Sequence, residues 1–325
     1  MRRAAPVSRP RPSSWRQLGR AVGARLFWGL VTLLATAFIV FTLLNLSGDP
    51  AQAMAGEKAD PETVEQIRVS MGFDRPLHVQ LGRYLSRVVR GDLGESSFYR
   101  RPVAELLGQR LPFTIALAFG GLLVWVGVGV PLGVLTATRR GTWVDRTILV
   151  VSIVTYSLPT FWLGRMLQQY LAYDRPWFPV GGYGSPAHLV LPSICLGLAG
   201  VGYYARLVHT NMVEALPADY VRTARAKGLT ERVVVWRHAF RCAMLPVVTI
   251  LGLDAARLLG GVVFTEAIFA WPGLGSQMVA AIPNLDIPLV LGTVLFAAAL
   301  VVMSNLVVDL LYFWLDPRLR DEGRI

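Results

Sequence analysis

Charged residues are scarce in this chain, and cysteine is almost absent. Only 16% of the 325 residues are charged, 54% are hydrophobic and the mean hydropathy is +0.48, which is too apolar for a soluble globular protein of this length. Cys195 lies in an apolar run and Cys242 lies in a basic segment, so neither a disulfide nor a cysteine-rich metal site is expected. The composition predicts an all-α polytopic membrane protein.

Catalytic signatures are missing as well. The chain has no Gly-x-x-x-x-Gly-Lys-Ser/Thr phosphate-binding loop, so we expect no ATP, and no other cofactor, to be bound by this chain. It has no Gly-x-Ser-x-Gly nucleophile motif, and none of its four histidines is paired at the spacing of helical metal ligands. These absences argue against an intramembrane protease or hydrolase, and we expect no metal site and no enzymatic activity.

The positively charged residues are distributed along the chain as they are in membrane proteins. The net charge is +11, seven arginines fall within the first 25 residues, and most of the others lie at the ends of apolar runs. Anionic lipid head groups and the positive-inside rule explain this distribution. No basic groove with interleaved aromatic residues is present, so membrane lipid is an expected partner and nucleic acid is not.

Apolar runs of bilayer length predict six membrane-spanning helices, since about 20 apolar residues suffice for one span. Residues 26–46 form the first run, after a basic tail at 1–25. A cleavable signal peptide is the alternative, because Ala51-Gln-Ala53 imitates a cleavage site, but the uncharged run is longer than such peptides use. Residues 112–315 hold the other five runs, at 113–137, 147–170, 188–211, 244–270 and 289–314, and residues 316–325 form a second tail. Pro159 predicts a kink in the third run.

The segment 47–111 between the first two runs is polar, with nine basic and nine acidic residues. Its balanced charge predicts an external location. Pro and Gly positions predict helices over 60–72 and 76–91. The segment is either a subdomain that lies on the membrane and helps to dock an external binding protein, or a solvated amphipathic connector.

The basic segment 212–243 is the longest polar stretch inside the core region. Pro217 and Asp219 favour the start of a short helix and Gly228 favours its end. Thr230 can begin a second helix that runs to about Cys242. On charge alone, this segment is a cytoplasmic loop that obeys the positive-inside rule.

The order of residues in this segment indicates more than its charge does. Residues 219–229, Asp-Tyr-Val-Arg-Thr-Ala-Arg-Ala-Lys-Gly-Leu, resemble the cytoplasmic coupling loop of ATP-binding-cassette importer permeases, in the branch that serves dipeptides, oligopeptides and nickel. In the wider superfamily this loop has the sequence Glu-Ala-Ala, followed by three residues and then Gly. The equivalent residues here are Arg222, Thr223 and Ala224, followed by Gly228, so only the second alanine and the glycine of that pattern are present. Thr265-Glu266 with Trp271-Pro-Gly-Leu-Gly275 resembles the external re-entrant gate of the same permeases, over residues 271–288.

The resemblance implies a type I importer permease with an external helical insertion between helices 1 and 2. It implies transport of di- or oligopeptides, or of a similar solute, across the bacterial plasma (inner) membrane, with both termini cytoplasmic. The implied partners are a second homologous permease subunit, two cytoplasmic ATPase subunits that bind ATP and Mg, and an external substrate-binding protein. The implied ATPase-coupling residues are Asp219, Tyr220, Arg222, Thr223, Ala224, Arg225, Ala226, Lys227, Gly228 and Leu229.

Charges inside the predicted spans are the other candidates, because each costs about 2.5–3.5 kcal/mol at a helix centre and should face the bundle interior. Asp254 and Arg257 are three residues apart and are predicted to pair along a solute path. A structural ion pair and interfacial snorkelling are the alternatives, above all for Arg165. The candidates for the path and gate are Asp254, Arg257, Glu266, Trp271, Pro272, Gly273, Gly275 and Arg165.

Other functions remain open at this point. An ion-gradient-driven secondary transporter would be expected to carry inverted repeats and acidic residues at mid-membrane, and no convincing repeat is present. An importer of nickel chelates or another solute in the same family, and a membrane scaffold whose basic loop recruits a cytoplasmic protein, are further alternatives.

Overall fold

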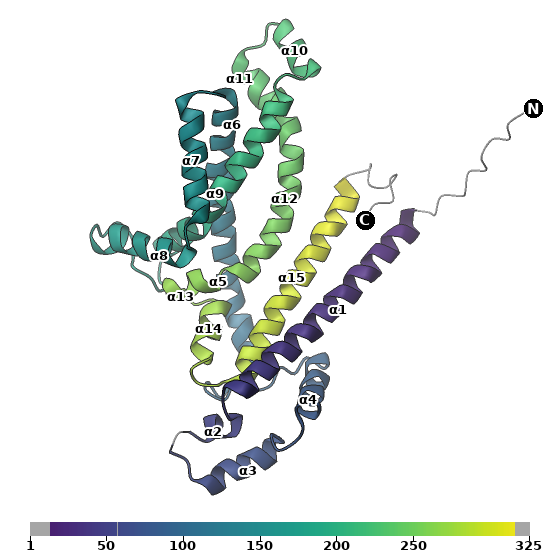
Figure 1. The fold of residues 1–325 in the computed structure, drawn as a ribbon, viewed down its shortest axis with the longest axis vertical. Helices are drawn as coiled ribbons and strands as arrows, with labels where there is room; N and C mark the ends of the chain where they lie inside the picture. The colour runs from purple at the N-terminus through teal and green to yellow at the C-terminus, as the bar shows by residue number, and fades with distance from the viewer. Residues whose placement is uncertain (1–13, 57, 316–325) are drawn as a thin grey trace, which may run out of the picture.

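A computed structural model describes residues 14–56 and 58–315, and Figure 1 shows that this part of the chain is built from helices. Over the described residues, the one β feature is an isolated bridge between Glu95 and Pro102. The helices are α1 (Ser14–Ser47), α2 (Pro50–Ala55), α3 (Pro61–Met71), α4 (Leu77–Val89), α5 (Val103–Val124), α6 (Val130–Thr138), α7 (Trp143–Ser157), α8 (Thr160–Gln168), α9 (Ala187–Ala215), α10 (Asp219–Ala226), α11 (Glu231–Val233), α12 (Phe240–Gly261), α13 (Val263–Ile268), α14 (Leu274–Ala281) and α15 (Ile287–Leu315), with π-helical turns η1 (Trp125–Gly129), η2 (Gln169–Tyr173) and η3 (Val234–Ala239).

Five helical segments of the described chain are long and apolar enough to cross a membrane. They are Val22–Ser47, Val103–Thr138, Ala187–Ala215, Glu231–Gly252 and Ile287–Val308. A sixth span is present if α7 and the segment Thr160–Tyr173 are counted as one, although they meet at 102°. The prediction of an all-α polytopic fold is therefore confirmed, and it is consistent with a type I importer permease.

The break in the third predicted span lies where Pro159 predicts it, but it is much sharper than a kink. Helix α7 ends at Ser157, and Leu158 adopts an extended conformation, which is what the residue before a proline prefers. Helix α8 then leaves the bundle sideways (Figure 1).

Helix α9 is the centre of the bundle and packs against α5, α6, α7 and α12. Glycines allow the closest approaches, as small residues do in membrane helices. A side chain on Gly133 of α6 would lie 2.6 Å from the Ala205 carbonyl oxygen of α9, and one on Gly202 would strike the Ser152 backbone of α7. Helices α6 and α7 therefore both lie directly against α9.

Helices α1 and α15 form a pair that diverges from the rest of the bundle toward the α10 end (Figure 1). Helix α1 begins at Ser14, ahead of residue 26, where the apolar run starts. At the opposite end the pair is covered by α4, whose buried Tyr84 lies in one apolar cluster with Phe41 of α1 and Leu291 of α15. The insertion thus rests on this pair of helices and on the start of α5, whose Val103 and Leu107 belong to the same cluster.

Both predicted helices of the insertion are present, and a short third one, α2, precedes them. Asp60 caps α3 by accepting from the Glu62 amide at 3.0 Å, and Gly72 ends α3 in a left-handed conformation with φ of 73°. Asp49 caps α2 and pairs with Arg68 of α3 at 2.6 Å. Burial raises the pKa of Asp49, but the hydrogen bonds from Arg68 and from the amides of Ala51 and Gln52, with the positive charge of Arg68, together outweigh burial and hold the pKa below its ordinary value. This ion pair joins the two helices outside the membrane.

Candidate functional site

Helix α10 lies at the tip of the molecule, farthest from the insertion (Figure 1). Its inward face is apolar, because Val221 and Ala224 are buried in a cluster with residues of α6, α9 and η3. The other predicted coupling residues are exposed: Asp219, Tyr220, Arg222, Thr223, Arg225, Ala226, Lys227, Gly228 and Leu229. The helix therefore presents a polar face to the solvent while an apolar face holds it to the bundle.

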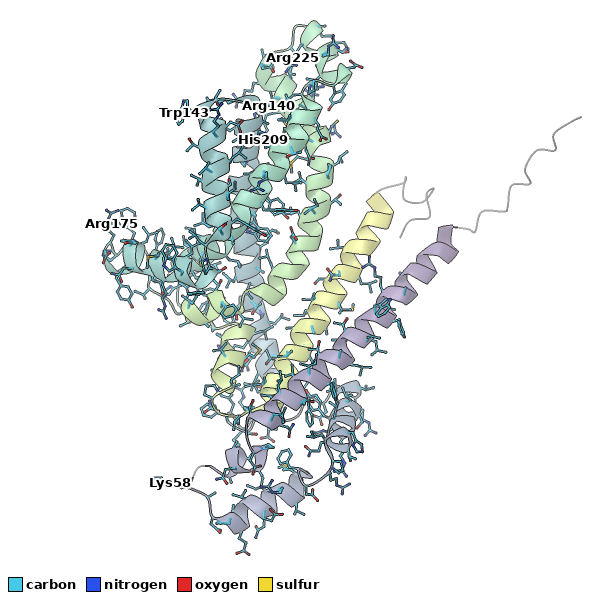
Figure 2. The ribbon with its side chains drawn as sticks, in the orientation of Figure 1. Lys58, Arg140, Trp143, Arg175, His209 and Arg225 are labelled. Carbon is cyan, nitrogen blue, oxygen red and sulfur yellow. The ribbon has the colours of Figure 1, made fainter. Side chains whose placement is uncertain are left out.

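The two arginines of this helix differ in their contacts, although their spacing predicts a shared face. Arg225 donates to both carboxylate oxygens of Glu231, at 3.1 and 2.7 Å, and so joins α10 to α11. Arg222 has only an exposed contact with Asp219 at 3.6 Å, a geometry that contributes little. Arg225, labelled at the tip in Figure 2, therefore builds the turn, and Arg222 is the arginine that is available to a partner.

Gly228 ends this helix as the sequence predicts. Its φ is 74°, and a side chain there would meet no atom within 4 Å, so the requirement for glycine is conformational and not steric. The amide of Gly228 donates to the Arg225 carbonyl oxygen at 2.9 Å.

The second helix of the basic segment does not end near Cys242, and this part of the prediction is wrong. Thr230 occupies the position before the first turn without making a side-chain cap. From there α11, η3 and α12 follow one another without a break from residue 231 to 261. The apolar residues after Cys242 continue the helix because nothing ends it there. The Gly228 turn is therefore attached directly to a membrane-spanning helix.

The predicted gate is built around the buried carboxylate of Glu266 in α13. Its Oε1 accepts from the Thr114 hydroxyl of α5 at 2.7 Å, and its Oε2 accepts from the amides of Gly275 and Ser276 at 2.7 and 3.1 Å. These amides belong to the first turn of α14, whose free N–H groups favour an anion. A side chain on Gly273 would strike the carboxylate. Glu266 therefore holds the start of α14 against α5.

The aromatic part of the gate makes a second attachment to α5. The indole N–H of Trp271 donates to the Phe113 carbonyl oxygen at 2.9 Å, and its ring meets those of Phe113 and Tyr183 edge to face. Arg110 donates to the Pro272 carbonyl oxygen at 3.4 Å. A side chain on Gly275 would overlap the Val263 backbone. The predicted gate residues Glu266, Trp271, Pro272, Gly273 and Gly275 are thus brought together.

The predicted path residues are not gathered at this gate. Asp254 lies on α12, where the buried Tyr204 of α9 donates its hydroxyl to Oδ2 at 2.9 Å. The ring of Tyr204 stacks on Trp125, with centroids 5.4 Å apart. The side chain of Arg257 lies outside the described part of the structure, so its pairing with Asp254 stays a prediction.

Arg165 lies apart from both groups, on the lateral helix α8. It is exposed and donates to the Gln168 side-chain oxygen at 3.1 Å. Gln168 is buried and donates to the carbonyl oxygens of Val180 and Ile268, at 2.8 and 3.0 Å. Arg165 is therefore placed to support the contact between α8 and the gate.

One buried residue of the gate loop escaped the sequence analysis. Asp286 is fully buried and accepts a hydrogen bond from the Ser96 hydroxyl. It also accepts from the amides of Ser97 and Phe98, and both of these distances are 3.2 Å. Its Oδ1 also accepts from the Leu289 amide at 3.3 Å, at the start of α15. The sequence does contain a signal for this role. Asp286 directly precedes Ile-Pro and a long apolar run, and an aspartate in that position is typical of a helix N-cap. Asp286 thus connects the insertion to the loop before α15.

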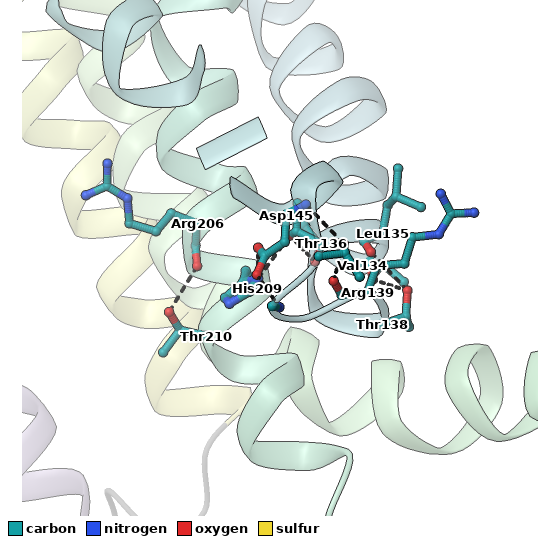
Figure 3. Close-up of polar contacts among 12 residues, drawn as sticks. Val134, Leu135, Thr136, Thr138, Arg139, Asp145, Arg206, His209 and Thr210 are labelled. Atoms are coloured by element: carbon teal, nitrogen blue, oxygen red, sulfur yellow. Dashed lines mark hydrogen bonds and ion pairs between the residues drawn. The ribbon is translucent and has the colours of Figure 1, made fainter. Parts of the chain in front are cut away.

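A second polar group joins the α6–α7 turn to α9 near α10 (Figure 3). His209 Nδ1 lies 3.0 Å from the Thr136 hydroxyl and 3.6 Å from Asp145 Oδ1. The other oxygen of Asp145 accepts from the Gly141 amide at 2.9 Å. All three side chains are largely shielded from solvent. The described residues contain no group of three or more His, Cys, Asp or Glu side chains that could hold a metal ion.

Comparison with known proteins agrees with this arrangement. Residues 129–321 match the family described as the binding-protein-dependent transport system inner membrane component, and residues 18–118 match its N-terminal family. The chain is 40% identical to a putative peptide transport system permease protein of Brucella abortus (strain 2308), over 91% of this chain and 97% of that protein. It is also 40% identical to the glutathione transport system permease protein GsiC of Salmonella paratyphi A, with the same coverage of both chains.

Proposed function

The chain belongs to the family of binding-protein-dependent transport system inner membrane components, and we propose that it forms one half of a translocation path for peptides. It is a multi-pass inner membrane protein and the permease subunit of an importer. It is not an enzyme, because ATP hydrolysis belongs to separate subunits. Its family implies ATPase and substrate-binding partners.

One observation carries the proposed mechanism: a single helical run leads from just after the Gly228 turn to Gly261, and one residue separates its end from α13. Residues 231–261 lead from the α10 end of the molecule to α13, which holds Glu266. A displacement of α10 therefore moves the helix that ends next to the gate. We propose that closure of the ATPases displaces α10 and that this run carries the displacement to α13 and α14.

The partners follow from the two ends of the molecule. We propose that the exposed face of α10 around Arg222 docks on one of two cytoplasmic ATPase subunits, which bind ATP and Mg, and that this chain binds no cofactor. The insertion at the opposite end faces the external binding protein. A second homologous permease subunit completes the path, and both termini are cytoplasmic. The comparisons give no support to an ion-gradient-driven transporter.

The solute that we propose is a short peptide. The relatives are named for peptide and glutathione transport, and glutathione is itself a small peptide. Asp254, held by Tyr204 on the bundle interior, is the charged group of the path that would face the solute. Nickel chelates are the second candidate within the same family.

Uptake in living cells tests this assignment. A strain that lacks the gene is compared with the same strain carrying a plasmid copy, using a labelled dipeptide, a labelled tripeptide, glutathione and a nickel–histidine chelate. We expect the plasmid to restore uptake of at least one of the peptides, and to leave nickel uptake unchanged. Restoration of nickel uptake alone would reject peptides as the solute, and uptake that persists after ATP depletion with the ion gradients intact would reject the ATP-driven mechanism.

A further inference from the structure

The external insertion encloses a cleft of about 650 Å³ that the transport mechanism does not use. Its walls come from the end of α3, from α4 and from the segment 94–100. Its apolar floor is formed by the outer ends of the membrane-spanning helices, with Phe41 of α1 and Leu291 of α15. This volume falls in the range of small-ligand sites, roughly 300–1,000 Å³. The cleft lies beside the path and not within it.

Three arginines line this cleft: Arg83, Arg87 and Arg100. Within the part of the chain that the structure describes, none of their guanidinium groups makes a hydrogen bond or an ion pair. Other arginines of the same insertion are paired, since Arg68 binds Asp49 at 2.6 Å and Arg101 binds Glu105 at 2.5 Å. Three arginines without a partner among the described residues thus share one cleft, whereas Arg75 and Arg90 of the insertion lie outside it.

All three arginines are exposed, and two of them lie at or beside backbone positions with a positive φ, Arg100 and Gly72. The guanidinium of Arg83 lies over Gly72, where a side chain would be 2.8 Å from Nη1. Arg100 has a φ of 52°, which is uncommon for a residue other than glycine and is a form of strain that is found at binding sites. Glu95 is the single carboxylate among the lining residues, so positive charge prevails.

Two hydroxyl groups at the cleft lack a partner. The Tyr84 hydroxyl and the Ser97 hydroxyl are both buried and make no hydrogen bond to described residues, and Tyr84 is only 5% exposed. Burial raises the pKa of the Tyr84 phenol, so it is neutral at physiological pH and has a proton to donate. Buried hydroxyls without a partner are costly and uncommon in folded proteins. A ligand with acceptor oxygens would satisfy both.

We propose that this cleft is a binding site for an oxyanion group, a carboxylate or a phosphate, held by Arg83, Arg87 and Arg100 with hydrogen bonds from Tyr84 and Ser97. Guanidinium groups bind both anions through paired N–H donors. The group has two possible sources: a dissolved anion, or the head group of an anionic phospholipid that reaches the cleft from the outer ends of α1 and α15. The site is separate from the gate around Glu266.

Residue-resolved modification of arginine tests the proposal. The full chain, purified in maltoside detergent with the subunits that accompany it, is treated with phenylglyoxal, and the modification rate of each arginine is measured by mass spectrometry. One arm adds inorganic phosphate and the other adds phosphatidylglycerol. Arg90 of the same helical region is the matched control, because it is exposed and does not line the cleft. We expect slower modification of the three cleft arginines and an unchanged rate at Arg90.

The two arms and one conservative variant give distinct results. Protection by phosphate identifies a site for dissolved anions, and protection by phosphatidylglycerol alone identifies a lipid site. Tyr84→Phe, which removes only the hydroxyl, should raise the concentration needed for protection by about fivefold, as expected for one lost hydrogen bond. Equal protection of Arg90, or no protection of the three cleft arginines in either arm, would overturn the proposal.

Discussion

At the scale of single residues, the gate depends on a carboxylate that is paired with hydrogen-bond donors and not with a cation. Glu266 is fully buried, and its two oxygens accept from the Thr114 hydroxyl and from the amides of Gly275 and Ser276. Hydrogen bonds to a charged group contribute about 1.5–3 kcal/mol each, and donors that are left unsatisfied cost a similar amount. Together with the attachment that Trp271 makes to α5, Glu266 therefore holds α14 in place.

Substitution of Glu266 tests that dependence. Glu266→Gln keeps the shape but turns an NH₂ group toward at least one of the three donors, and we expect a loss of about 2–4 kcal/mol in unfolding stability. Glu266→Leu removes every acceptor and should lose more. Thermal unfolding of the purified protein measures both. Glu62→Gln, an exposed change in the insertion, is the control, and a Glu266→Gln protein that unfolds like this control would contradict the role of Glu266.

The residue types at the gate and coupling helix could be predicted from the sequence, but their contacts could not. Arg222 and Arg225 are equivalent by helical spacing, and only the position of Glu231 after the Gly228 turn separates them. Asp286 and Ser96 are 190 residues apart, so no local pattern joins them. Tertiary packing decides such pairs.

Among the elements, the insertion is attached through Asp286 to the loop before α15, and hydrogen exchange can test this connection. Asp286→Asn replaces one acceptor oxygen by an NH₂ group, so the Ser96 hydroxyl and the amides of Ser97 and Phe98 lose part of their partner. We expect those two amides to exchange faster by about tenfold, the effect of roughly 1.4 kcal/mol in local opening, while α9 is unchanged. Asp74→Asn, at an exposed aspartate of the insertion, should leave exchange at 97–98 as it is. Equal exchange in the two variants would show that Asp286 does not hold this segment.

The α6–α7 turn has its own polar attachment, and a double-mutant cycle measures it. His209→Ala and Thr136→Val each remove one side of the 3.0 Å contact between α9 and α6. We expect a coupling of about 1 kcal/mol between them in the free energy of unfolding. The cycle of His188→Ala with Thr136→Val, whose contacts are separate, should be additive. Additivity in the first cycle as well would mean that the contact contributes nothing.

Element by element, hydropathy and the Pro and Gly positions predicted most helices, including α3, α4 and α10 with its stop. Two features of the structure differ from what the sequence predicts. The bend of 102° between α7 and α8 depends on where α8 packs, and a proline alone does not set that angle. The continuity of residues 231–261 was missed because the polar residues from Thr230 to Cys242 look like a separate helix, whereas the buried Val234 and Val235 join it to the core.

For the whole molecule, we propose that the insertion and α10 lie on opposite sides of the membrane, and Figure 2 shows Lys58 and Arg225 at opposite ends. Labelling of single cysteines in intact cells with an impermeant reagent tests the orientation. In a Cys242→Ala background, we expect labelling at Ser70→Cys and Ser185→Cys, and none at Arg140→Cys or Lys227→Cys until the membrane is permeabilised. All four positions are exposed, so the opposite result would reverse the topology.

We propose that the Gly228 turn transmits ATPase closure to the membrane helices, and ATPase stimulation by the loaded binding protein in the reconstituted complex tests this role. Gly228 has a φ of 74° in open space, so Gly228→Val adds backbone strain of about 1–3 kcal/mol without a clash, whereas Gly228→Asn tolerates this conformation. We expect normal membrane insertion of both variants, with stimulation and uptake lost in Gly228→Val and largely retained in Gly228→Asn. Undiminished stimulation and uptake in Gly228→Val would contradict this role and would leave this segment a connector.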